Sequence, residues 1–343
     1  MMSSRPRAAT SPLLLWLAAL AALALDPHLH PHSVGTALLW FHLFLAVLLG
    51  LMGRKSSILL FGLTPLLTGT GAALLRLALP LDLGWAIVIE SRILLPALQK
   101  ILGWEVLHLN GTPVQLLALL LPLWMMGSVI LLLRFLQKWL QTARWVRTLP
   151  LSDDQHLHGL VRRVTGQDIP IRYTDGGSPA IYGLIRPVLL LPDYPYTDAQ
   201  LDRILRHEWQ HRTGGDVWIK LLLELLCILL WWSPLVWLLR RKSRHVLELR
   251  CDFGVLRGLT EAERLEYYDT ILQTARMAKG HTSSPYLSML AAPPLVERFE
   301  VGLDYAAIAR RSEVRARLLC LAILLCFALS YIVVFRSGVP LWN

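Results

Sequence analysis

Residues 207–211 read His-Glu-Trp-Gln-His, and the segment that follows, residues 217–239 (VWIKLLLELLCILLWWSPLVWLL), is almost wholly apolar. In a helix, positions four residues apart face the same side, so His207 and His211 are predicted to bind one zinc ion. Glu208 lies between them and is predicted to reach a water molecule that the ion activates. The stretch therefore indicates a helix that carries a zinc site and leads into an apolar segment.

The composition favours a membrane protein. Of the 343 residues, 55% are hydrophobic and the mean hydropathy is +0.48, which is too apolar for an ordinary soluble enzyme. The net charge of +10 comes from lysines and arginines that cluster beside the apolar runs, as membrane orientation requires, so no direct nucleic-acid partner is expected. We expect neither a disulfide framework nor a cysteine zinc site, because no C-x-x-C pair occurs among Cys227, Cys251, Cys320 and Cys326.

Long apolar runs predict a mainly α integral membrane protein with a transmembrane helix bundle. Residues 13–25 follow Arg5 and Arg7 and fit either a signal peptide or a first anchor, of which the anchor is favoured. The further expected segments are a helical pair at 34–52 and 57–79, a mixed loop with an interfacial helix at 80–112, and spans at 113–135 and 317–335.

Basic residues flank these runs on one predicted side of the membrane. They are Arg5, Arg7, Arg54, Lys55, Arg134, Lys138, Arg144, Arg147, Arg310, Arg311, Arg315 and Arg317. Since loops rich in lysine and arginine stay in the cytosol, the stretch 137–315 is predicted to be cytosolic. The expected divisions are an anchor or signal-like segment at 1–33, transmembrane helices with a periplasmic loop at 34–136, a cytosolic zinc domain at 137–315, and a last span with a short tail at 316–343.

Within 137–315 the sequence predicts an α+β domain. Its first part shows an amphipathic helical pattern at 152–166 and strand-like runs at 169–174 and 184–191, separated by the turn-rich 175–179. The second strand-like run directly precedes the histidine helix, so we predict that it is the edge strand that presents an extended peptide substrate. The residues assigned to this edge are Leu184, Arg186 and Val188, with Arg186-Pro187 limiting pairing on one side.

The histidine helix has a predicted start and end. Thr197 is placed to cap it, and Gln200, three residues later, completes a capping box. Gly214-Gly215 is a helix-ending pair. Asp216 is then predicted to cap the helix that follows.

The apolar segment is interrupted in its middle by Trp231-Trp232-Ser233-Pro234, and proline ends or kinks a helix. A single crossing would leave Glu248 on the opposite side of the membrane from His207. If the chain instead runs out and back, each arm is about 21–24 Å long, and Glu248 returns to the level of the histidines. We therefore predict a helical hairpin at 216–250 that is either re-entrant or lies on the membrane surface.

Glu248 is the predicted third zinc ligand, which leaves the fourth position for water as a catalytic site requires. The alternative is an exposed helical acid beside Arg244. Glu224 is a poorer candidate, because a rigid helix carries it about 15–20 Å beyond His211. It is expected to pair with Lys220, one turn earlier.

Other polar residues receive predicted roles around this site. Glu208 is the predicted general base, which takes a proton from the attacking water and later delivers it to the leaving amine. Asp252 shares a helical face with Glu248 and is predicted either to orient a ligand histidine or to form a salt bridge with Arg250 or Arg257. The donor to the oxyanion stays open among His245, Tyr267 and Tyr268. A solvated loop is the interpretation for His28, His30 and His32.

Four stretches are specific enough to compare with known families. They are SPAIYGLIRP at 178–187 with LLP at 190–192, the H-E-x-x-H at 207–211, WWSPLVW at 231–237, and ELRCD at 248–252. Together they resemble the bacterial membrane zinc metallopeptidases of the β-lactam sensor-transducer type, the BlaR/MecR group, from residue 34 to residue 335.

The resemblance implies a gluzincin-like peptidase in the bacterial inner membrane, with its catalytic domain in the cytosol, one Zn²⁺ per chain and Glu248 as the third ligand. In that family the peptidase cleaves itself and brings about the loss of a DNA-bound repressor. The implied substrates are therefore a cytosolic repressor and the chain itself, and the other implied partners are the lipid bilayer and a second copy in a homodimer. Residues 281–294 stand at the position that resembles the self-cleavage loop.

The chain departs from the family pattern in three places, one of which is an extra N-terminal apolar segment. It stops at Asn343 without the extracellular penicillin-binding domain of well-known members, so direct acylation by β-lactams is not expected. Gly214-Gly215 stands where relatives often carry charged residues. Two other functions stay open: a quality-control peptidase that degrades damaged membrane proteins, and a non-catalytic transducer in which zinc only braces the fold. The intact Glu208 argues against the second, since a purely structural site has no use for that carboxylate.

Overall fold

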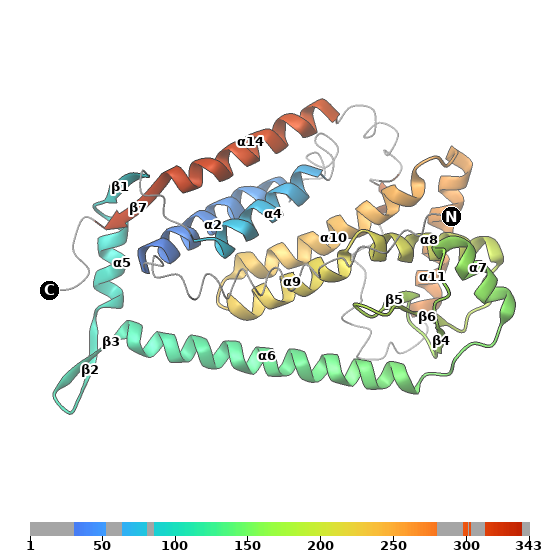
Figure 1. The fold of residues 1–343 in the computed structure, drawn as a ribbon, viewed down its shortest axis with the longest axis horizontal. Coiled ribbons are helices and arrows are strands. Elements are labelled where there is room, and N and C mark those ends of the chain that lie inside the picture. The colour runs from blue at the N-terminus through green and yellow to red at the C-terminus, as the bar shows by residue number, and fades with distance from the viewer. Residues whose placement is uncertain are drawn as a thin grey trace, which may run out of the picture. The chain divides into compact units, whose positions relative to one another are not determined.

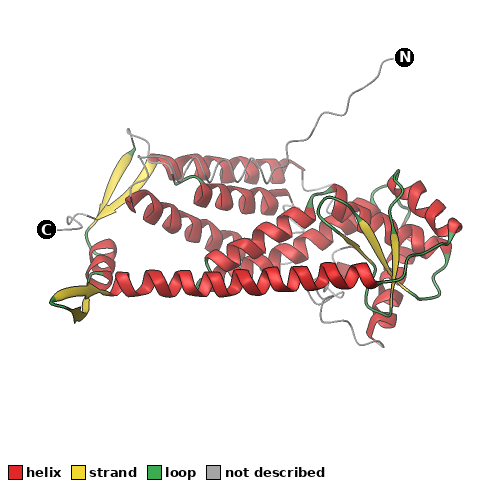
Figure 2. Ribbon diagram, turned by 60° about the horizontal axis from the view of Figure 1, so that its bottom comes forward, coloured by secondary structure: helices red, strands yellow, loops and turns green. Residues whose placement is uncertain are grey.

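The computed structural model describes residues 31–52, 64–80, 86–279, 298–300, 302 and 313–337, which are mostly helical (Figure 2). The chain divides into two compact units. One comprises Met1–Leu51, Thr64–Leu120 and Val314–Asn343, and the other comprises Met52–Leu63 and Leu121–Glu313. The predicted anchor at 13–25, the histidines His28 and His30, and the predicted self-cleavage segment 281–294 lie outside the described residues.

In the first unit, three helices pack together: α2 (Pro31–Met52), α4 (Thr64–Ala78) and α14 (Glu313–Ile332) (Figure 1). Gly69 on α4 lies at their contact, where an added Cβ would come within 2.9 Å of Leu48 and 3.7 Å of Ile323. Small residues allow this close approach of helices. α2 and α4 correspond to the helical pair that was predicted at 34–52 and 57–79.

The predicted loop at 80–112 contains more regular structure than expected. It holds strand β1 (Ile87–Ser91), helix α5 (Leu94–Leu102) and strand β2 (Glu105–Leu109), which forms an antiparallel hairpin with β3 (Thr112–Gln115) through Asn110-Gly111. β1 pairs in parallel with β7 (Val333–Ser337). The last predicted span, 317–335, is therefore corrected: the helix ends at Ile332 and the chain continues as a strand, in which valine and phenylalanine favour sheet pairing.

Within the part of the chain that the structure describes, two helices are long and apolar enough to cross a membrane. They are α6 (Leu116–Thr148) and the stretch Val314–Ile332 of α14. A shorter apolar helical stretch covers Gly35–Gly50. α6 continues well past the predicted end at residue 135. Its second half, which is basic, is helical up to Thr148.

The second unit contains a three-stranded sheet of β4 (Ile171–Thr174), β5 (Ala180–Tyr182) and β6 (Val188–Pro192), in the order β4-β6-β5. β6 runs parallel to β4 and antiparallel to β5, so it is the central strand. The predicted edge strand is therefore wrong: Val188 lies in the centre of the sheet, and Leu184 and Arg186 lie in the loop before it. The continuous apolar run in β6 is typical of a strand that is covered on both faces.

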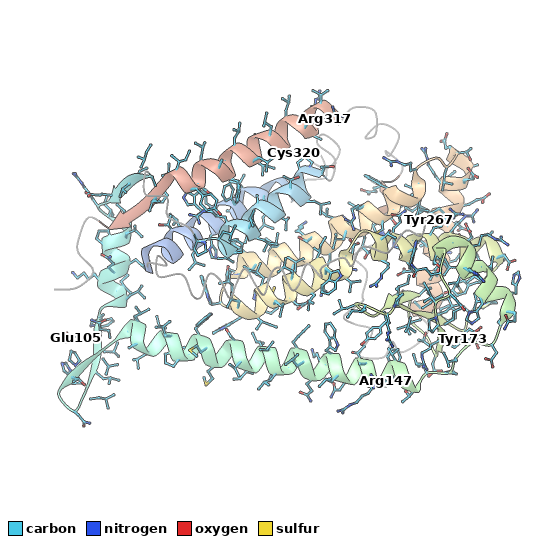
Figure 3. All side chains as sticks on the ribbon, viewed as in Figure 1. Glu105, Arg147, Tyr173, Tyr267, Arg317 and Cys320 are labelled. Carbon is cyan, nitrogen blue, oxygen red and sulfur yellow. The ribbon has the colours of Figure 1, made fainter. Side chains whose placement is uncertain are left out.

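Helix α7 (Gln155–Thr165) and helix α8 (Asp198–Thr213) pack with this sheet around one core. The prediction of an amphipathic helix at 152–166 is confirmed, and Asp154 caps its start by accepting from two backbone N–H groups. Tyr173 of β4 packs against the core (Figure 3). The buried core residues are Leu157, Leu160, Val161, Ile169, Ile171, Leu189, Leu191, Leu201 and Leu205.

The predicted hairpin is present as α9 (Asp216–Leu229) and α10 (Pro234–Leu256), followed by α11 (Glu261–Lys279) (Figure 1). Pro234 occupies the start of α10, where its missing N–H costs nothing. The predicted pairing of Glu224 with Lys220 is wrong. Glu224 accepts hydrogen bonds from Arg240 at 2.7 Å and Arg244 at 2.6 Å, because the returning arm brings both guanidinium groups beside it.

Candidate metal centre

Helix α8 positions the two histidines. The predicted capping box is confirmed: Thr197 Oγ1 accepts from the Gln200 N–H at 3.3 Å, and Gln200 Oε1 accepts from the Thr197 N–H at 3.0 Å. His207 and His211 lie further along the helix, one turn apart, and the centroids of their imidazole rings are separated by 4.9 Å. Leu201 and Leu205 on the same helix are buried in the core with α7 and the sheet, and His207 is itself buried.

The glycine pair after α8 has a structural reason that the sequence alone did not give. The helix ends at Thr213, and Gly215 adopts a φ of +73°, which is strained for any other residue. A Cβ atom at Gly214 would overlap the guanidinium group of Arg250. Gly214 and Gly215 therefore allow a sharp turn in which α10 packs directly against the end of the histidine helix.

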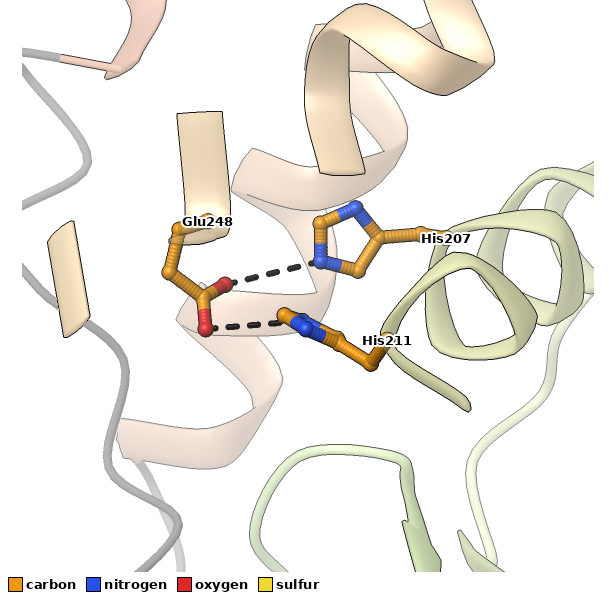
Figure 4. Close-up of side chains that lie close together, drawn as sticks. All are labelled: His207, His211 and Glu248. Atoms are coloured by element: carbon orange, nitrogen blue, oxygen red, sulfur yellow. Dashed lines mark ion pairs between the residues drawn. The ribbon is translucent and has the colours of Figure 1, made fainter. Parts of the chain in front are cut away.

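Glu248 returns to the histidines as the hairpin prediction requires (Figure 4). Its carboxylate oxygens lie 3.5 Å from His207 Nε2 and 3.4 Å from His211 Nε2, and all three side chains are mostly buried. Two ligand atoms about 2.1 Å from a tetrahedral zinc ion lie about 3.4 Å from each other. The separations therefore fit a shared ion. The alternative for Glu248, an exposed acid beside Arg244, is wrong because Glu248 is 7% exposed.

A chain of hydrogen bonds fixes the orientation of His207. Its Nδ1 lies 2.8 Å from the Tyr267 hydroxyl and 3.3 Å from Asp252 Oδ1. Tyr267 (Figure 3) donates its hydroxyl to Asp252 at 2.7 Å, so the hydroxyl oxygen is left to accept from the His207 Nδ1–H. Arg298 donates twice to Asp252, at 2.8 and 2.6 Å, and lies 3.4 Å from Glu248. This arrangement leaves Nε2 of His207 as the atom available to a metal.

His211 has a corresponding chain on the other side. Its Nδ1–H donates to Asp216 Oδ2 at 2.7 Å, and Asp216 in turn forms an ion pair with Arg250. The thiol of Cys251 lies 3.2 Å from the same nitrogen and 3.4 Å from Asp216. The prediction that Asp216 caps α9 is corrected: Gly215 is the capping residue, and the fully buried Asp216 orients His211 instead.

The buried charges around His207 shift three pKa values. Burial disfavours the imidazolium, but hydrogen bonds to Asp252 and Glu248 outweigh it and raise the pKa of His207 to about 9. Burial favours the neutral form of Asp252, but the charge and hydrogen bonds of Arg298 hold its pKa well below the usual value. Burial and the neighbouring Asp252 carboxylate raise the pKa of Tyr267 well above 10.

The other predicted residues are placed as follows. Glu208 is half-buried on α8, between the two histidines in sequence. Tyr267 is bonded to the Nδ1 side of His207, away from the carboxylate of Glu248, so it is not placed to stabilise an oxyanion. Tyr268 is buried against Tyr267 and Phe299. Asp252 forms its ion pair with Arg298, whereas the prediction named Arg250 or Arg257.

Sequence reasoning missed Arg298 and the role of Arg212. Arg298 is 3% exposed, and the only signal for it was that a buried Asp252 needs a cation. Arg212, on α8, donates to the carbonyl oxygens of Gly183, Leu184 and Ile185 at 3.0, 2.6 and 2.9 Å. These bonds attach the loop after β5 to the end of the histidine helix.

Comparisons with known proteins agree with this geometry. Residues 88–301, more than half of the chain, match the profile of the family described as BlaR1 peptidase M56. The chain is 30% identical over 196 residues to the regulatory protein BlaR1 of Bacillus licheniformis, which covers 55% of this chain and 31% of that protein. It is 23% identical over 120 residues to the methicillin resistance mecR1 protein of Staphylococcus aureus, which covers 34% of this chain and 20% of that protein. The matched part thus spans less than a third of the length of either relative. The chain belongs to the BlaR1 peptidase M56 family.

Proposed function

We propose that this chain is a zinc-dependent endopeptidase of the gluzincin type that acts in signal transduction at the bacterial inner membrane. The observation that carries the proposal is the grouping of two Nε2 atoms with the Glu248 carboxylate: Oε2 lies 3.5 Å from His207 Nε2 and Oε1 lies 3.4 Å from His211 Nε2, each close to the edge of a zinc tetrahedron. Two histidines and a glutamate leave a fourth position open, as catalytic zinc sites do. Zinc bound there would supply Lewis-acid activation of water and of the scissile carbonyl.

The chain's own residues would perform the proton transfers and hold the ligands. Glu208 takes a proton from the attacking water and delivers it to the leaving amine, which requires it to remain accessible, and it is half-buried. Asp252 orients His207 through the Tyr267 hydroxyl, and Asp216 accepts from the His211 Nδ1–H directly, so that both rings present Nε2 toward Glu248.

A peptide substrate would pair with the edge of the sheet at β5. The outer side of β4 is bridged by Leu151, whereas β5 forms the opposite edge and contacts α8. An extended peptide added to such an edge gains main-chain hydrogen bonds, which suits a peptidase that acts on flexible segments. The loop at 183–185, held by Arg212, would lie at one end of the bound peptide, beside the histidine helix.

The proposed substrates are a cytosolic transcriptional repressor and the chain itself. This part of the proposal is supported by the relatives, one of which is a regulatory protein and the other a resistance protein. A cytosolic face is supported by the basic half of α6, which carries Arg134, Lys138, Arg144 and Arg147 and leads into the unit that holds the site.

The test compares the wild-type chain with Glu208→Gln in cells and in vesicles. We expect the fragments of the chain and of candidate repressors to fall by about 10²–10⁴-fold, because the general base is lost. Zinc content should stay the same, since Glu208 is not a ligand. Exposed Glu261→Gln is the matched control and should cleave normally. Identical fragments from Glu208→Gln and wild type would reject peptidase activity. Equal cleavage of unrelated misfolded membrane proteins would favour quality control.

A further inference from the structure

The turn between α9 and α10 is attached to helix α6. Trp124 of α6 donates its indole N–H to the carbonyl of Leu229 at 2.7 Å, and Trp231 donates its own indole N–H to the carbonyl of Trp124 at 3.3 Å. Gly127, one turn further along α6, lies under the Trp231 ring, where an added Cβ would come within 2.7 Å of the indole. The two tryptophans and the glycine thus form one docking contact within the second unit.

This contact lies far from the charged end of α6. The first charged residue after the apolar part of the helix is Arg134, about ten residues from Trp124, which corresponds to about 15 Å along the axis. A hydrocarbon core is about 30 Å thick, so Trp124 would stand near its middle if Arg134 marks the surface. The hairpin shows a similar spacing between its turn and its first basic residues. Arg240 and Arg241 follow Ser233 by about 10–12 Å along α10.

The backbone at the turn has hydrogen-bond partners that do not depend on water. Trp124 satisfies the carbonyl of Leu229, and Trp237 satisfies that of Trp231 at 2.9 Å. The N–H of Ser233 donates to the carbonyl of Leu230 at 2.9 Å. Non-helical backbone at membrane depth is tolerated only where protein supplies such partners. A turn lying in water would have no need of indole donors on its carbonyls.

The outer surface of the turn is apolar, and its one acid is compensated. The large exposed side chains there are Leu225, Leu229, Trp232, Trp237 and Leu238. Glu224 is bonded to Arg240 and Arg244, and Arg240 also lies over the Trp237 ring at 4.6 Å. Charged groups near a bilayer are found paired and with long side chains that reach the interface, as these are.

We propose that the α9–α10 hairpin is re-entrant: its turn enters the hydrocarbon core from the side of Arg134, is held against α6 by Trp124, Gly127 and Trp231, and contacts lipid chains at about half the membrane depth. The inference rests on the proposed membrane location of α6, but it does not depend on peptidase activity. It decides between the two positions that the sequence left open. A hairpin on the membrane surface would require the middle of the apolar part of α6 to lie at that surface.

The test measures depth with spin labels on the full chain in phosphatidylcholine–phosphatidylglycerol vesicles. Cys320 and Cys326 are replaced by alanine and the buried Cys227 and Cys251 are kept, with labelling of this parent protein as the blank. One cysteine at a time is then introduced at Leu229, at Val129 of α6, or at Arg241. Collision of each label with oxygen and with a water-soluble nickel chelate gives its depth. We expect the labels at Leu229 and Val129 to be rich in oxygen collisions and poor in nickel collisions, and the label at Arg241 to collide readily with nickel.

Two results would overturn the inference in distinguishable ways. If the label at Leu229 collides with nickel as readily as that at Arg241 while Val129 stays in lipid, the hairpin lies on the surface and the proposed membrane location of α6 survives. If Val129 itself collides with nickel, that location fails as well. Gly127→Leu tests the docking contact, because the added side chain displaces Trp231; the nickel collisions at Leu229 should rise several-fold. Val129→Leu is the matched control and should change nothing, and an unchanged Leu229 label in Gly127→Leu would reject the contact.

Discussion

Replacing Asp252 with asparagine tests whether the hydrogen-bond network that joins His207, Tyr267, Asp252 and Arg298 supports the proposed metal site. Asp252 is fully buried and accepts from Arg298 at 2.8 and 2.6 Å and from Tyr267 at 2.7 Å, with His207 Nδ1 at 3.3 Å. Asparagine keeps the shape but removes the charge. Three effects then weaken zinc binding together: His207 loses the anion that supports it through Tyr267, the field at the ion becomes less negative, and Arg298 turns to Glu248, from which it lies 3.4 Å.

The expected magnitudes follow from these contacts. Losing a group that orients a ligand histidine lowers metal affinity by about 10–100-fold. Leaving the buried Arg298 without its principal partner destabilises the fold by about 3–5 kcal/mol. The first is measured by zinc competition against a chelator, and the second by denaturant unfolding of the metal-free protein. Asp202→Asn is the matched control, since its pair with Arg206 is partly exposed and should contribute only about 0–1 kcal/mol.

A double-mutant cycle separates the pair from its surroundings. If Asp252 and Arg298 act as one unit, Arg298→Gln in the Asp252→Asn background should restore part of the lost stability, because no unpaired buried charge remains. Zinc affinity should stay below that of the wild type, since the pair of His207 and Tyr267 still lacks the anion behind it. Additive losses of stability, or a zinc affinity of Asp252→Asn within about twofold of the wild type, would refute this reasoning.

Three further substitutions test neighbouring parts of the site. Asp216→Asn removes the acceptor of His211 Nδ1–H and should lower zinc affinity by about 10–100-fold in the same competition assay; an unchanged affinity would show that His211 needs no such support. Thr197→Ala removes the capping box of α8 and should cost about 1 kcal/mol in unfolding while leaving zinc affinity alone. Leu205→Ala opens a cavity behind the histidine helix and should cost about 2–5 kcal/mol; a loss below 1 kcal/mol would contradict the packing described.

Local signals in the sequence were sufficient for the histidine helix and the hairpin. The capping box at Thr197 needs only two side chains three residues apart, and the Ser233-Pro234 break needs only the geometry of proline. Helix length alone then places Glu248 beside the histidines, because Glu248 lies about as far from the turn along α10 as α9 is long. These elements are fixed by interactions within a few residues, so no knowledge of the rest of the chain was required.

The errors concern contacts between residues that are distant in sequence. β6 was taken for an edge because it precedes α8, but a strand's own residues do not reveal how many neighbours it has, and β5, too short to notice, pairs on its other side. The pairing of β1 with β7 joins residues near 90 and near 335. Asp216 illustrates a subtler case. The rule for helix starts found the correct residue, but the glycine before it took the capping position and released the carboxylate for His211.

The hydrogen-bond networks behind His207 and His211 also determine the charge of the site. Each orienting carboxylate is neutralised by its own arginine: Asp252 by Arg298 and Asp216 by Arg250. Two further acids belong to the proposed site: Glu248 and, next to His207 in sequence, Glu208. Glu248 lies 3.4 Å from Arg298 and 3.6 Å from the partly exposed Lys220, which offset its charge only in part because Arg298 also pairs with Asp252 and solvent screens Lys220.

A divalent cation would balance these two acids, and binding it would leave little net charge in a mostly buried space. Without the arginines, four carboxylates would surround the histidines, and such a site would favour protonation of its acids over a defined zinc geometry. In the proposed zinc site, Arg250 and Arg298 would therefore set the net charge that a bound ion has to balance.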